Sequence, residues 1–213
     1  MPLQMYNRRA EPRRRVWEYI SPNPTTSNWM VGNSQMAKFN GAQDYQIIYK
    51  RGGRIEEIIS QAEWLITTKG ATHVVIDGIQ NSITAITRGR LNLEAEILRR
   101  LKFLNTRASV VLAEVLYCPQ HQHINDEIQR INRQVKQINR EASGLASPKP
   151  WRVLGEVRRA QNRKQKDEIS TFPESFSRDG YHISPSKALE YEAELAAFLR
   201  GMVASTPASG NRT

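Results

Sequence analysis

Two short segments of the chain carry residue types that together could perform acyl transfer. Asp179 and His182 stand three residues apart, just before an amphipathic run, and Ser34 follows a short apolar run that ends at Gly32. A serine hydroxyl becomes a nucleophile when a histidine takes its proton and a carboxylate orients that histidine. The residue types therefore allow a Ser34–His182–Asp179 triad, if the fold brings together segments that lie 148 positions apart.

The same residues also fit a purely structural interpretation. Asp179 and Ser34 could each cap a following helix, because short polar side chains accept hydrogen bonds from the free N–H groups of a first helical turn. Gly53 could serve only as a turn residue. From these residues alone, both interpretations stay open.

The elements that must position these residues follow from the apolar pattern. Short apolar runs alternate with amphipathic runs, an order typical of an α/β fold with a central parallel sheet and helices on both faces. We expect strands near residues 29–31, 45–49, 73–77 and 109–116, with 151–154 as a possible last strand. We expect helices near 55–66, 93–104, 124–138 and 185–202.

The chain is long enough for one domain, but part of it is expected to lie outside the packed core. Its apolar fraction of 39% is below the average of globular proteins. Residues 1–27 are rich in arginine and proline and are expected to form a basic, disordered amino-terminal arm. The domain then spans 28–202, with a basic irregular insertion at 143–176 and a flexible tail at 203–213.

Four segments that bear glycine or polar residues follow expected strands or precede an expected helix. In open α/β sheets, ligands bind outside the carboxyl ends of the strands. Each segment is a weak signal alone, but their order and placement together are more informative. The segments are Gly32-Asn33-Ser34, Gly52-Gly53, Gly78-Ile79-Gln80-Asn81 and Asp179-Gly180-Tyr181-His182.

In this order the segments resemble the four blocks of the SGNH/GDSL hydrolase superfamily, which centre on Ser, Gly, Asn and His. The resemblance covers roughly residues 28–202 and is closest to esterase-like domains of non-LTR retrotransposon or viral open reading frames. Asn33 stands where the family usually has Asp, and the third-block Asn falls on Gln80, with Asn81 one position later. The resemblance implies a three-layer, flavodoxin-like sandwich and a serine esterase that acts on a short acyl ester of a sugar or lipid.

The family pattern also implies a role for each matched residue. Ser34 would attack the ester carbonyl, His182 would carry the proton, and Asp179 would orient His182. The oxyanion would be held by the backbone N–H groups of Ser34 and Gly53 and by the side-chain amide of Gln80 or Asn81. The resemblance implies no metal and no cofactor.

The net charge of +10 is concentrated in two segments. Residues 1–15 carry a net +4 and residues 149–166 a net +6, so the rest of the chain is neutral. Such segments favour contact with polyanions, although solvated loops of this composition are also common. The alternative function is therefore a degenerate SGNH-like module that binds RNA or DNA with little or no catalysis. Its candidate contacts are Arg13, Arg14, Arg15, Arg158, Arg159, Arg163 and Lys164.

Cysteine content and hydropathy argue against three further classes of protein: disulfide-bonded, zinc-binding and membrane-spanning. Cys118 is the only cysteine, so no internal disulfide can form, and it is expected to act as a small buried apolar residue. One Cys and four scattered His match no zinc-ligand spacing. No apolar signal core and no run of about eighteen apolar residues are present. We therefore expect an intracellular protein with no transmembrane segment.

Overall fold

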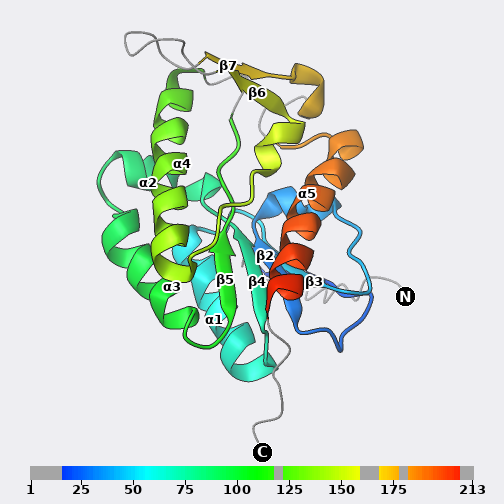
Figure 1. Ribbon diagram of the computed structural model, residues 1–213. Coiled ribbons are helices and arrows are strands. Elements are labelled where there is room, and N and C mark those ends of the chain that lie inside the picture. Colours follow the sequence, from blue (N-terminus) through cyan, green and yellow to red (C-terminus); the bar gives the residue numbers. More distant parts are fainter. Residues whose placement is uncertain (1–15, 118–121, 159–167, 178–181, 207–213) are drawn as a thin grey trace, which may run out of the picture.

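A mixed sheet of five strands forms the centre of the chain (Figure 1). The computed structural model describes residues 16–117, 122–158, 168–177 and 182–206. The sheet order is β1-β3-β2-β4-β5, in which β2 to β5 run parallel and β1 pairs antiparallel with β3. The strands are β1 (Trp17–Ile20), β2 (Asn28–Gly32), β3 (Gln46–Lys50), β4 (His73–Asp77) and β5 (Ser109–Leu112). The predicted α/β class is confirmed, and the sheet that was expected to be parallel is parallel in all strands except β1.

Strand β1 lies within the stretch that the sequence placed in the amino-terminal arm. Its residues Trp-Glu-Tyr-Ile have high strand propensity, but the arginines and prolines around them conceal the signal. Trp17 lies opposite Lys50 and Ile20 opposite Ile47. Because β1 is antiparallel, its first residue lies at the carboxyl end of β3. Residues 1–15 of the expected arm lie outside the described residues, as do residues 207–213 of the tail that was expected at 203–213. Residues 203–205 of that expected tail instead continue the last helix, which ends at Ser205.

The helices follow the expected apolar periodicities. The longer ones are α1 (Ile55–Lys69), α3 (Leu98–Leu104), α4 (Gln122–Ser143) and α5 (Pro185–Ser205), and a short α2 spans Ile83–Thr87. A single π-helical turn, η3 (Leu93–Ile97), precedes α3, so the helix expected at 93–104 forms in two parts. Short 3-10 helices are η1 (Ser34–Lys38), η2 (Gln80–Ser82), η4 (Pro150–Val153) and η5 (Pro173–Ser175). Of the described helices, none is long and apolar enough to cross a lipid bilayer.

The alternation of side chains along the strands divides the apolar core into two clusters. Val31, Ile48 and Ile76 join residues of α1, α3 and α4 in one cluster. Met30, Ile47 and Val75 join residues of η1 and α5 in the other. Neighbouring strand residues therefore belong to different clusters, as expected for strands that are buried on both sides.

The segment between α4 and α5 is more regular than expected. The possible last strand at 151–154 is mostly the 3-10 helix η4, whose first residue is Pro150, a residue that suits a helix start. Strands β6 (Gly155–Arg158) and β7 (Glu168–Thr171) then form a separate antiparallel ribbon. This ribbon and the start of α5 lie at the end of the sheet to which the β5 arrowhead points (Figure 1).

Two asparagines of α4 close the outer edge of the sheet. Asn139 accepts a hydrogen bond from the Leu112 N–H at 2.9 Å and donates to the Leu112 carbonyl at 2.8 Å. Asn132 makes the same pair of bonds to Val115, at 2.6 and 3.0 Å. Both asparagines are buried, and their amides take the place of a neighbouring strand. The strand expected at 109–116 therefore ends at Leu112, and the hydrogen bonds of Asn132 fix the backbone beyond it at Val115.

Candidate active site

The turn that carries Ser34 begins where β2 ends. Gly32 permits the turn, because a Cβ atom at this position would lie 2.7 Å from the Asp77 carbonyl oxygen and from the Met36 thioether. The Asn33 N–H donates to the Asp77 carbonyl at 3.2 Å. The Asn33 side-chain oxygen accepts from the Gln35 N–H at 3.0 Å and so caps η1. Ser34 thereby becomes the first residue of a short helix at the carboxyl edge of the sheet.

The structure brings Ser34 and His182 together. Their Oγ and Nε2 atoms are 3.2 Å apart, within hydrogen-bond distance, and both side chains are partly exposed. His182 lies just before α5 in a loop closed by two backbone bonds: Ser177 N–H to the His182 carbonyl at 2.7 Å, and Ser184 N–H to the Ser175 carbonyl at 2.8 Å. Asp179 lies between Ser177 and His182 in the sequence but outside the described residues.

The candidate oxyanion donors differ in their surroundings. Within the described part of the chain, the Ser34 N–H has no hydrogen-bond acceptor. The Gly53 N–H donates to the Lys50 carbonyl at 3.0 Å in a tight turn in which Gly52 has a φ of +63°. The Asn81 amide donates to the Gly53 carbonyl at 3.0 Å, and Gln80 is buried at the start of η2. The segment that carries Gln80 and Asn81 is thus hydrogen-bonded to the turn that carries Gly53. The oxyanion roles of Gly53, Gln80 and Asn81 stay predictions.

Asp77 is a buried carboxyl group directly beside the turn that carries Ser34. It ends β4, lies opposite Gly32 in the sheet register, and is 6% exposed. Burial raises the pKa of Asp77 to about 6, and a hydrogen bond of 2.9 Å from the Tyr191 hydroxyl opposes that rise. Sequence reasoning did not single out Asp77, although a charged residue at the end of the run His-Val-Val-Ile-Asp was a usable signal.

Gln35 and Lys38 are the other residues that the sequence did not indicate. Both belong to η1, and both make hydrogen bonds to Ile183, the residue after His182. A local sequence pattern could not reveal them, because their partner is a backbone unit almost 150 residues away.

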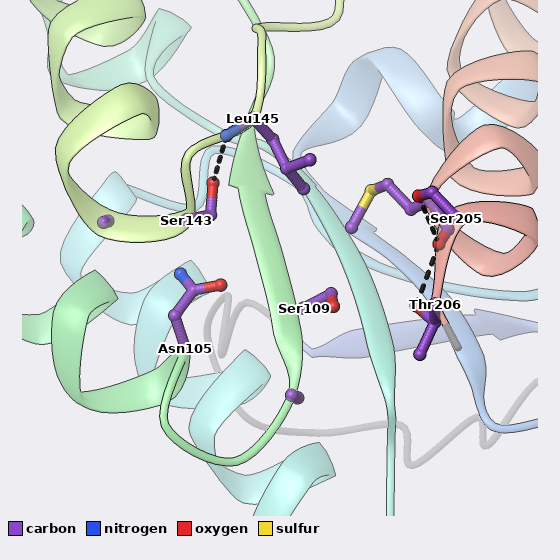
Figure 2. Close-up of a pocket in the computed structure, with 9 residues that line it drawn as sticks. Asn105, Ser109, Ser143, Leu145, Ser205 and Thr206 are labelled. Atoms are coloured by element: carbon purple, nitrogen blue, oxygen red, sulfur yellow. Dashed lines mark hydrogen bonds between the residues drawn. The ribbon is translucent and has the colours of Figure 1, made fainter. Parts of the chain in front are cut away.

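A cavity of about 390 Å³ lies elsewhere in the molecule (Figure 2). Its walls include Asn105, Ser109, Ser143 and Thr206. Ser109 is the first residue of β5, whereas Ser34 follows the carboxyl end of the parallel strand β2. The cavity is thus at the opposite edge of the sheet from the Ser34–His182 pair, and the chemistry of the pair, not the size of the hollow, identifies the candidate site.

The other predicted site residues are only partly placed. Arg158 is the last residue of β6. Cys118 and six of the candidate nucleic-acid contacts lie outside the described residues, and these six are Arg13, Arg14, Arg15, Arg159, Arg163 and Lys164. No group of three or more His, Cys, Asp or Glu side chains forms a metal site in the described ranges.

Comparison with known proteins gives one finding about the fold. No known protein family matches the chain, and no curated protein matches it. A solved structure described as that "of a putative platelet activating factor from Streptococcus pneumonia" is similar, with a TM-score of 0.53 and 12% identity. The match covers 82% of this chain and 84% of that one. At this identity the likeness concerns the fold alone, and it shows that the α/β arrangement extends over most of both chains.

Proposed function

We propose that the chain is a serine esterase of the SGNH type that hydrolyses a short acyl ester of a sugar or lipid. The observation that carries the proposal is the 3.2 Å separation of Ser34 Oγ and His182 Nε2. The four-block order and the carboxyl-edge position of the Ser34 turn support it. The similar solved structure fits the proposal at the level of fold. We further propose that the sheet and its helices form the three-layer, flavodoxin-like sandwich of that superfamily.

The proposed reaction proceeds through an acyl-enzyme. Ser34 Oγ attacks the ester carbonyl carbon while His182 Nε2 takes the hydroxyl proton, and His182 then gives this proton to the leaving alcohol. Water, deprotonated by the same histidine, releases the acid. Asp179 orients the imidazole ring. The Ser34 N–H is the first candidate to hold the oxyanion, and Gly53 could add a second donor only by giving up or sharing its bond to the Lys50 carbonyl.

Serine-directed labelling tests this proposal. The full chain should hydrolyse p-nitrophenyl acetate, and a fluorophosphonate should attach once per molecule and block that hydrolysis. Peptide mass mapping should place the adduct on Ser34. Heat-unfolded protein serves as the control, because labelling needs the assembled pair. Hydrolysis no faster than in buffer, or an adduct on another residue, would contradict the proposal.

A second candidate function is binding of RNA or DNA through the basic segments. The observation that favours it is where these segments join the described chain. Residues 1–15 lead into β1, whose first residue lies opposite the carboxyl end of β3. Residues 159–167 connect β6 to β7, and β7 leads through η5 to the His182 loop. Trp17 and the β6–β7 ribbon, the described residues that these segments join, thus lie toward the end of the sheet that carries Ser34, and the two functions can coexist.

Salt dependence tests this second candidate. Because each phosphate contact releases counterions, binding of a fluorescent single-stranded RNA should weaken steeply with salt. Deletion of residues 1–15, which carry a net +4, should lower the slope of log K against log salt by roughly 3. Neutralising Arg88, Arg99, Lys102 and Arg107, four exposed cations outside the basic segments, is the charge-matched control. Anisotropy that is insensitive to salt or to the deletion would rule out the role.

A further inference from the structure

The turn that carries Ser34 and the loop that carries His182 are joined by two parallel hydrogen bonds. The first joins Ser34 Oγ and His182 Nε2 at 3.2 Å. In the second, the side-chain oxygen of Gln35 accepts the Ile183 N–H at 3.0 Å. The two pairs are successive in both segments, so each candidate catalytic residue has a neighbour that is bonded to the neighbour of the other.

Lys38 binds the carbonyl of Ile183, the residue whose N–H is bound by Gln35. Its ammonium donates to the Ile183 carbonyl at 2.6 Å and to Ser177 Oγ at 3.0 Å. The Ser177 N–H in turn donates to the His182 carbonyl at 2.7 Å. The Ile183 N–H and carbonyl and the His182 carbonyl are therefore all occupied, which leaves the backbone beside His182 little freedom to turn.

Of the two residues that bond Ile183, Gln35 is the more important one, because its hydrogen bond is buried. It is 3% exposed, and its own N–H is held by the Asn33 side chain, so its side chain projects from a fixed backbone. Ile183 is 1% exposed, so its N–H is buried, and the Gln35 side chain is the acceptor that satisfies it. An unsatisfied buried donor drives the local backbone to move until it finds another acceptor.

We propose that Gln35 is a positioning residue that sets the place of His182 relative to Ser34, with Lys38 as a second brace. The inference rests on the proposed esterase function and deepens it, because it says what holds together a pair so far apart in the sequence. Gln35 touches neither the ester nor the transferred proton. Its effect on the reaction comes from geometry, since a displacement of about 1 Å in a catalytic group can cost about a hundredfold in rate.

Kinetics of the Gln35→Met variant test the inference. Methionine keeps the length of the side chain and removes the strong acceptor. We expect kcat for p-nitrophenyl acetate to fall by about 10- to 100-fold, with KM within about twofold of wild type. Rates are divided by the concentration of folded protein, measured by gel filtration and from the urea unfolding curve, so loss of folded protein does not count as loss of rate. Gln35→Glu keeps an acceptor at the same position and should recover most of kcat.

Gln46→Met is the matched control. Gln46 is also a buried glutamine whose amide bonds distant groups, namely the Ser21 hydroxyl at 2.6 Å and the Thr26 carbonyl at 2.7 Å. It begins β3, at the opposite edge of the sheet, and its variant should lose stability but keep kcat per folded molecule. Wild-type kcat in Gln35→Met, or an equal loss of kcat in Gln46→Met, would overturn the inference. An inactive wild-type chain would instead refute the proposed function on which it rests.

Discussion

Replacement of Ser34 with alanine is expected to lower kcat/KM for p-nitrophenyl acetate by at least about a thousandfold. The alanine side chain cannot form the acyl-enzyme, so only the bound geometry and the oxyanion donors would still assist attack by water. The side chain is only partly buried and makes one described hydrogen bond, to His182. Its loss should therefore change the free energy of unfolding by no more than about 1 kcal/mol. Initial rates with the purified variant, together with its urea unfolding curve, measure both quantities.

Ser186→Ala provides the comparison for this prediction. Ser186 is an exposed serine in the first turn of α5, near the His182 loop, and its hydroxyl lies 3.1 Å from that of Ser184. It has no part in the proposed reaction, so its variant should hydrolyse the ester at the wild-type rate. If Ser34→Ala kept the same rate as Ser186→Ala, the Ser34–His182 contact would be structural only. The chain would then be better explained as a binding module.

The pairing of Ser34 with His182 was accessible from the sequence through the four-block resemblance, and chain order and strand ends support it. Each apolar run that became β2, β3 or β4 is followed by a glycine-bearing segment. Parallel strands place such segments at one edge of the sheet. His182 precedes α5, whose residues pack in the same apolar cluster as Met36 of the Ser34 turn. Chain order and hydrophobic periodicity thus agree with the pairing, but the resemblance of the four segments to known blocks was needed to choose it over the capping interpretation.

The hydrogen bonds around that pair were not accessible, because they depend on distances of a few tenths of an ångström. Gly53 was expected to aim its N–H at an oxyanion, yet the turn after β3 directs it to the Lys50 carbonyl. The amide of Gln80 or Asn81 was expected to donate to the same oxyanion, and in the structure the Asn81 amide donates to the Gly53 carbonyl. A motif records which residue types are present, whereas the choice among several acceptors within reach is made by the packed backbone.

Asp77→Asn is expected to stabilise the protein at neutral pH. The pKa of Asp77 is raised from its ordinary 3.8 to about 6, chiefly by burial. The folded state therefore holds the Asp77 proton more tightly than the unfolded state does. Stability falls as the pH rises from about 4 to about 6, and above that range the fold bears the whole cost of the buried charge, about 3 kcal/mol. Asparagine carries no charge and keeps an acceptor for the Tyr191 hydroxyl, so the variant should escape this cost.

The difference in unfolding free energy between Asp77→Asn and wild type, followed by urea denaturation from pH 4 to pH 8, isolates this group from all others that titrate. The difference should be near zero at pH 4, because a protonated carboxyl and an amide are both neutral, and should reach about 3 kcal/mol in favour of the variant above pH 6. Asp44→Asn is the control of opposite sign. The Arg200 guanidinium, which donates a hydrogen bond to Asp44, lowers the pKa of that carboxyl, so its replacement should destabilise the fold as the pH rises. A difference for Asp77→Asn that does not change with pH would mean that the Asp77 carboxylate is as well stabilised in the fold as in water, so that its burial imposes no net cost.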